Sequence, residues 1–81
     1  MDEAALRKEV VAMLLAIAPE LDAATLKHAE PLRRQVDLDS YDWLHFLLEV
    51  NQRFGIEIPE RDYAKLATVD DLVRYLGAKA A

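Results

Sequence analysis

The sequence predicts an all-α fold, a small four-helix bundle of three main helices and one short helix, with a long loop between the first and second helices. Three segments repeat apolar residues at helical spacing, and each is followed by a residue that interrupts helices, namely Pro19, Gly55 or Gly77. Only "GIEIP" (residues 55–59) alternates as a strand does, and nothing else in the chain could pair with it. At 81 residues, the chain is expected to form a single domain, residues 1–81.

The first helix should end before Pro19, because the residue preceding a proline is driven out of the α conformation. Its inward face consists of apolar residues at helical spacing: Leu6, Val10, Met13, Leu14 and Ile17. No period holds from Ala18 to Leu38, so a long loop is expected, within which "DAATLK" could close one helical turn. So long a loop needs anchors on the core. Five apolar residues could provide them: Leu21, Leu26, Leu32, Val36 and Leu38.

The second helix is predicted from Ser40 to Phe54, with Asp39 as its cap and Gly55 as its terminator. At about 100° per residue, its apolar side chains form two separate arcs. One arc should face the core, and it contains Trp43, Phe46, Leu47, Val50 and Phe54. The other contains Tyr41, Leu44 and Leu48. A bundle this thin cannot cover both arcs, so the second is expected to be a protein-docking surface, unless the long loop folds over it.

The remaining elements follow "GIEIP", which should be an extended link anchored by Ile56 and Ile58. A short helical turn is expected after Pro59, from about Glu60 to Lys65. The last helix should open at Thr68, since Asp71 three residues later completes a capping box, and it should end at Gly77. Its inward residues are Val69, Leu72, Val73 and Leu76.

Composition and charge narrow the possible functions. Residues 37–62 contain seven acids and two bases, so this segment accounts for the whole net charge of −5. Such acidity argues against binding to nucleic acid and suits partners with basic surfaces, although it could also be a solvated face alone. The chain has no cysteine, which excludes disulfides and thiol nucleophiles and is typical of the cytoplasm. Its longest uncharged run, residues 10–19, is too short to span a membrane.

Ser40 stands at the positive end of the second helix, beside the predicted docking surface. Free N–H groups at such a position stabilise a phosphate, whereas a cap alone is the simpler role for a serine there. His45 lies about 140° away on the helix, too far round to activate Ser40, so no enzyme activity is expected. Asp42, His45 and Glu49 share a face but are interpreted as solvated side chains, and no metal site is predicted. A group attached to Ser40 by another protein fits better than catalysis by Ser40 itself, but from these residues alone the capping role is favoured over both.

Residues 38–76, "LDSYDWLHFLLEVNQRFGIEIPERDYAKLATVDDLVRYL", resemble the acyl carrier protein family. The resemblance implies that Ser40 carries 4′-phosphopantetheine, placed there from coenzyme A by a separate, magnesium-dependent phosphopantetheinyl transferase. It also implies that Asp39 both caps the helix and is recognised by that transferase. Tyr41 stands where the family usually has a leucine. Asp37 stands where the family often has a glycine, and an aspartate tolerates left-handed backbone better than most residues do.

The resemblance therefore predicts a carrier that holds acyl groups as thioesters in fatty-acid, polyketide or related acyl metabolism. Partners would be acyl-activating, acyl-transferring or condensing enzymes with basic surfaces, docking on Tyr41, Asp42, Leu44 and Leu48. Apolar cargo would sit near Phe46, Leu47 and Val50. Family members often have glutamates where this chain has His45, Asn51, Gln52 and Arg53, so we expect a specialised stand-alone member, monomeric and cytoplasmic. The alternatives are an unmodified helical adaptor that binds through Tyr41, Leu44 and Leu48, and a carrier of an activated amino acid.

Overall fold

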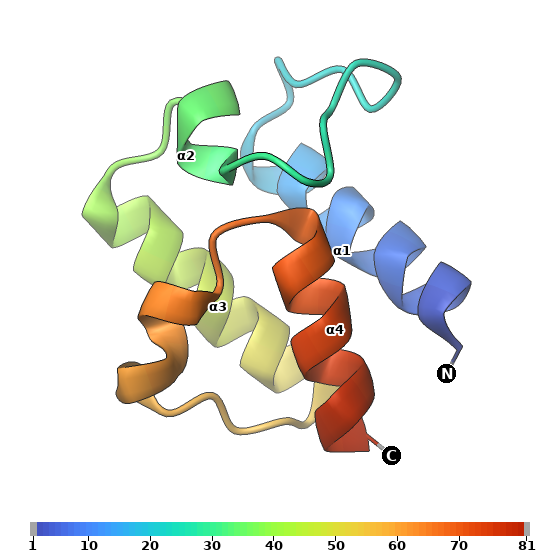
Figure 1. Ribbon diagram of the computed structural model, residues 1–81. Coiled ribbons are helices and arrows are strands. Elements are labelled where there is room, and N and C mark those ends of the chain that lie inside the picture. Colours follow the sequence, from blue (N-terminus) through green and yellow to red (C-terminus); the bar gives the residue numbers. More distant parts are fainter. Residues whose placement is uncertain (1, 81) are drawn as a thin grey trace.

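Three main helices and two short ones make up the computed structural model, which describes residues 2–80 (Figure 1). The main helices are α1 (Glu3–Ile17), α3 (Ser40–Phe54) and α4 (Val69–Ala80). The short ones are α2 (Leu32–Gln35) and the 3₁₀ helix η1 (Glu60–Lys65). Residues 2–80 contain no strand. The predicted all-α bundle is confirmed, as are both ends of α3 and the position of η1, whereas the single turn of α2 inside the long loop was not predicted.

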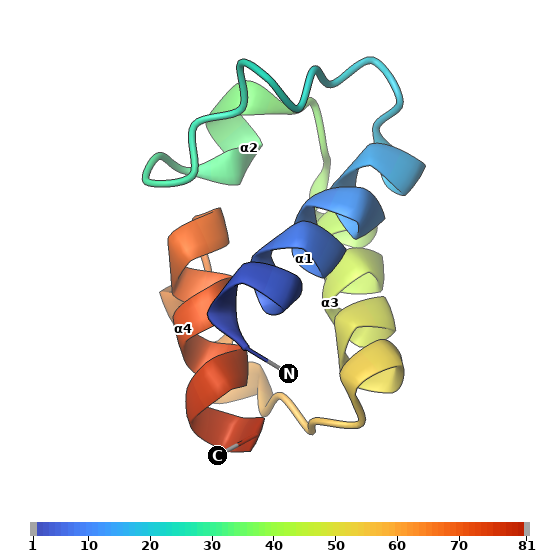
Figure 2. The ribbon, with the colours of Figure 1, turned by 90° about the vertical axis from the view of Figure 1, so that its right-hand side faces the viewer.

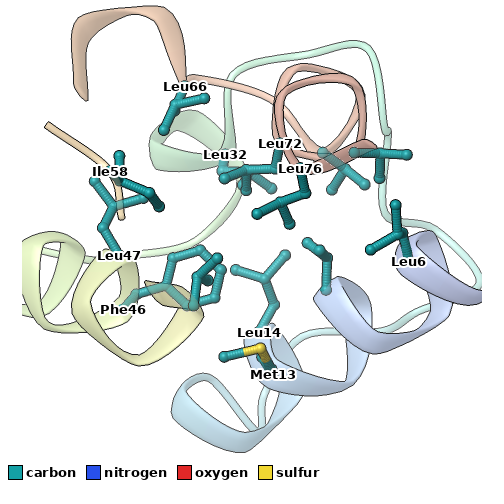
Figure 3. Close-up of a cluster of buried hydrophobic side chains, with 14 of the residues drawn as sticks. Leu6, Met13, Leu14, Leu32, Phe46, Leu47, Ile58, Leu66, Leu72 and Leu76 are labelled. Carbon is teal, nitrogen blue, oxygen red and sulfur yellow. The ribbon is translucent and has the colours of Figure 1, made fainter. Parts of the chain in front are cut away.

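Helix α1 contacts both α4 and α3, and Figure 2 shows it lying across the front of the molecule between them. Side chains from all three main helices meet in one core (Figure 3). The links contribute as well, because Leu32, Ile58 and Leu66 point into the same cluster. The fully buried large side chains are Leu14, Leu32, Phe46, Leu47, Leu66, Leu72 and Leu76. Because the links supply part of the core, the positions of the connecting segments are set by packing.

The predicted helix ends are confirmed at most positions. Helix α1 stops at Ile17, just before Pro19. At the start of α4, Asp71 N–H donates to the hydroxyl of Thr68 (2.9 Å), and Asp71 accepts from the amide of Thr68 (3.2 Å), which completes the capping box. The prediction that Gly77 ends α4 is wrong, since the helix continues to Ala80. The residues after Gly77 are good helix formers, and only Gly55 has a positive φ within residues 2–80.

The long loop is held to the core by the residues predicted to anchor it. Leu26, Leu32, Val36 and Leu38 are buried, and Leu21 is half-buried. "DAATLK" closes one turn, in which Leu26 N–H donates to the carbonyl of Asp22 (3.1 Å). Asp37 does not adopt the left-handed backbone that an aspartate could tolerate. Leu38 N–H donates to the carbonyl of Val36 (2.9 Å), so Asp37 is the centre of a tight turn with negative φ.

Two further findings concern the end of α3 and the length of the helices. Phe54 was predicted to face the core, but it is only half-buried, because it ends α3 and borders an open groove. None of the helices within residues 2–80 has the length and apolarity needed to cross a bilayer.

Candidate functional site

Ser40 is the first residue of α3, and its side chain is exposed. The cap of this helix is provided by Asp39, whose Oδ1 accepts a hydrogen bond from the amide of Asp42 (2.8 Å). A carboxylate in this position also interacts favourably with the helix dipole. Since Asp39 makes the capping bond, the hydroxyl of Ser40 is not needed for it. The simpler explanation of Ser40, a serine that serves only as a cap, is therefore not what the structure shows.

One side chain contacts the hydroxyl of Ser40. The Nη2 of Arg33, in α2, lies 3.5 Å from Oγ and forms a long hydrogen bond with it. No basic group that could take the hydroxyl proton contacts Ser40 among the described residues, because a guanidinium is a permanent cation with donors only. Within residues 2–80, the hydrogen-bond partner of the Ser40 hydroxyl is therefore a donor and not a base. The contact between Arg33 and Ser40 could not be predicted from the sequence, because their distance depends on the turn at Asp37.

The apolar surface predicted on α3 is present. Tyr41 is 71% exposed, Leu44 is 42% exposed and Leu48 is 45% exposed, and these are the exposed large hydrophobic residues found within residues 2–80. The long loop packs elsewhere, around Ala18, Val36 and Leu38. The alternative in which the loop covers this surface is therefore excluded. The predicted docking surface, which consists of Tyr41, Asp42, Leu44 and Leu48, begins at the residue after Ser40 and lies on the exposed side of α3.

The opposite side of α3 is packed against the rest of the bundle. Phe46, Leu47 and Val50 are buried in the core, and the ring of Phe46 stacks on Trp43 with centroids 5.5 Å apart. A separate open groove of about 770 Å³ lies between α1 and α3 and is bordered by Met13 and Phe54. None of the three buried residues lines that groove. The predicted acyl site near Phe46, Leu47 and Val50 thus corresponds to packed side chains and stays a prediction.

Charges on α3 are partly neutralised within the molecule. Arg53 donates two hydrogen bonds to Oε2 of Glu9 on α1, with Nη2 at 2.6 Å and Nε at 2.9 Å. His45 lies 3.8 Å from Glu49 one turn along the helix. Within residues 2–80, no three acidic or histidine side chains are grouped as they would be to hold a metal ion. The charge of Arg53 is therefore paired within the molecule.

Comparisons with known proteins agree with this geometry. The family model described as the phosphopantetheine attachment site matches residues 8–76. An acyl carrier protein of Wolinella succinogenes is 38% identical over 69 residues, which cover 85% of this chain and 86% of that protein. The chain belongs to the acyl carrier protein family.

Other acyl carrier proteins match over similar lengths. That of Thermosynechococcus vestitus is 32% identical over 74 residues, covering 91% of this chain and 86% of the relative. The meromycolate extension acyl carrier protein of Mycolicibacterium smegmatis is 30% identical over 76 residues, covering 90% of this chain and 77% of the relative. A solution structure from Anaplasma phagocytophilum, described as a candidate acyl carrier protein, superposes with a TM-score of 0.82 at 28% identity, covering 94% of this chain and 89% of that one.

Membership of the family assigns the function in general terms. This acyl carrier protein carries acyl groups on a covalently attached 4′-phosphopantetheine arm. Its partners are enzymes of acyl metabolism and a phosphopantetheinyl transferase. The residues at the start of α3 fit such an arm, because Ser40 is the only serine in the chain, is exposed, and has a cationic side chain beside it that suits a phosphate.

Proposed function

We propose that the 4′-phosphopantetheine arm is attached to Oγ of Ser40, and that the carrier presents thioester-bound acyl groups to enzymes of fatty-acid, polyketide or related metabolism. The observation that supports this most is the exposed hydroxyl of the chain's only serine, which lies within the region matched by the attachment-site family. The proposal includes a single carrier domain, residues 1–81, acting as a monomer in the cytoplasm.

Attachment requires little of the carrier itself. Oγ of Ser40 bonds to the phosphorus next to the pantetheine of coenzyme A, the bond from that phosphorus to the bridging oxygen breaks, and adenosine 3′,5′-bisphosphate leaves. The hydroxyl proton must pass to a base of the transferase, because Arg33 is the side chain that contacts Ser40. Asp39 holds the start of α3 in place and presents a carboxylate for recognition. Once attached, the arm supplies the thiol that carries the acyl group.

Partner enzymes would dock on Tyr41, Asp42, Leu44 and Leu48, so that their active sites lie near the arm. A tethered acyl group reaches each enzyme at a high effective concentration, which is the physical advantage of a carrier. Apolar cargo would be shielded near Phe46, Leu47 and Val50. Since these residues are buried in the core, such cargo would have to push α3 away from its neighbours.

Intact mass spectrometry tests the attachment site. Wild-type protein is incubated with coenzyme A, magnesium and a broad-specificity transferase, next to a known carrier as positive control. We expect wild type to gain one phosphopantetheine group and Ser40→Ala to gain none. Ser40→Ala should keep its stability within about 0.5 kcal/mol, because the hydroxyl is exposed and does not cap α3. A wild-type protein that stays unmodified while the control reacts would favour an unmodified adaptor.

We further propose that this carrier serves a dedicated acyl-activating or acyl-transferring enzyme. Basic patches that suit an acidic helix would meet His45 and Gln52 here, while Arg53 is already paired with Glu9. The malonyl transferase of the host's fatty-acid synthesis should therefore load malonyl groups onto the modified protein slowly. It should load the host's own fatty-acid acyl carrier protein, here called the housekeeping carrier, faster.

Replacement of the two exposed polar residues tests this reasoning. His45→Glu combined with Gln52→Glu should speed loading, whereas the neutral control His45→Gln should not. Arg53 is left unchanged, because a glutamate there would repel Glu9 and disturb the contact between α1 and α3. Wild-type loading as fast as that of the housekeeping carrier, with no effect of the added acids, would contradict specialisation through the charge of α3.

A further inference from the structure

Arg33 is a cation placed beside the proposed attachment point without an ionic partner of its own. Its Nη2 lies 3.5 Å from Oγ of Ser40, and it forms no ion pair with any of residues 2–80. We infer that Arg33 pairs with the phosphodiester that joins the arm to Ser40, and that it thereby stabilises the modified protein. This inference rests on the attachment proposed above.

The backbone that carries Arg33 is held on both sides. Leu32 is fully buried, and its amide donates to the carbonyl of Ala67 (2.8 Å). The side-chain amide of Gln35 both accepts from the amide of Lys27 and donates to its carbonyl, each at 2.8 Å. The link from α2 then leads directly into α3 (Figure 1). The backbone at Arg33 is therefore fixed before any arm is attached, so that no backbone entropy is lost when the side chain binds an anion.

Esterification changes the group that Arg33 faces. The hydroxyl of Ser40 becomes a phosphodiester, whose non-bridging oxygens share one negative charge and project just beyond Oγ. A guanidinium already in contact with Oγ can reach those oxygens by a small change in its side chain, without movement of the backbone. Its planar fork of donors matches phosphate geometry better than a lysine does.

The surrounding charges favour the same pairing. Before modification, Arg33 lies near the positive end of the α3 dipole, which is an unfavourable position for a cation. After modification, the new anion is close to the carboxylates of Asp39 and Asp42 at the same helix start, and these repel it. Pairing with Arg33 relieves both effects. The arm should therefore stabilise the protein more when Arg33 is present than when it is absent.

Thermal unfolding of the unmodified and modified proteins measures this coupling without any partner enzyme. We compare wild type, Arg33→Gln and Arg34→Gln, with the mass of each sample showing that the arm is in place. Arg34 is the matched control, since it is exposed, lies on the same turn and loses the same charge, whereas the hydrogen bond to Ser40 comes from Arg33. Arg33→Lys keeps the charge but loses the fork, and should retain part of the effect.

The change in Tm on attachment should be about 2–4 °C more favourable in wild type and Arg34→Gln than in Arg33→Gln, as expected for one exposed ion pair in a domain of this size. The difference should shrink at about 1 M salt, where charges are screened. The phosphorus NMR resonance of the arm should also move in Arg33→Gln and stay in place in Arg34→Gln. An arm that attaches normally and changes Tm equally in all variants would overturn the role of Arg33 alone. An arm that does not attach to wild type would overturn the attachment itself, and this inference with it.

Discussion

Leu47 and Leu48 are neighbours on α3 that differ in burial, so Leu→Ala at the two positions removes the same atoms from opposite surroundings. Leu47 is 1% exposed and Leu48 is 45% exposed. Truncating a buried leucine costs about 2–5 kcal/mol, from lost transfer free energy and the cavity left behind. Leu48 is buried by roughly half, and alanine is the better helix former, so we expect a loss of about 0.5–1 kcal/mol there.

These losses are large compared with the stability of the whole domain, which at typical values per residue is about 4–12 kcal/mol. Urea unfolding followed by circular dichroism should therefore shift its midpoint strongly for Leu47→Ala and slightly for Leu48→Ala. Phosphopantetheine transfer and acyl loading should show the reverse sensitivity under native conditions, because Leu48 belongs to the proposed docking surface. Equal stability losses would contradict the assignment of two faces to α3. Unchanged transfer and loading in Leu48→Ala would contradict the docking role.

The two glycines should respond to alanine with opposite signs in the same unfolding experiment. Gly55→Ala should cost about 1–2 kcal/mol, because Gly55 has φ +63° and caps α3 in the left-handed conformation. Gly77→Ala should stabilise the protein by up to about 1 kcal/mol, since Gly77 is helical and an added Cβ would make only an ordinary contact at 3.7 Å; destabilisation would contradict the continuous α4. Partial burial and the hydrogen bond to Asp62 (2.7 Å) raise the pKa of Tyr75 to about 12. The stability that this pairing contributes is present below the ordinary tyrosine pKa of 10.0 and is lost as the pH rises from there to about 12. Asp62→Asn should therefore lower the pKa of Tyr75, which is measured by the absorbance of tyrosinate. The same change should reduce the extra loss of stability at alkaline pH.

Helix α3 and the exposed surface beside Ser40 could be predicted from the sequence because their causes are local. Asp39 caps the helix through an amide three residues away, and Gly55 ends it by adopting a positive φ. The periodicity of its apolar residues separated Leu47 from Leu48. Such features depend on neighbours within one or two turns, so spacing alone is sufficient to infer them.

Contacts made by the loop could not be predicted in the same way. His28, for which the sequence suggested no role, accepts a hydrogen bond from Arg7 (2.9 Å), and Arg7 also pairs with Asp70 (2.6 Å). The carbonyl of His28 accepts from the amide of Asp70 (3.0 Å), so this cluster joins the loop to α1 and α4. None of these residues follows a periodic pattern that would relate it to the others.

The sequence by itself determined the three main helices, the cap beside Ser40 and the apolar surface that follows it, because each depends on short-range spacing. The tertiary structure decided which side chains from other elements reach that site. Arg33 contacts Ser40 because Leu32 is buried and the chain turns tightly at Asp37, and neither effect is visible as a pattern in the sequence. Similarly, Phe54 has the spacing of a core residue but is half-buried, since burial depends on whether another element packs over the end of the helix.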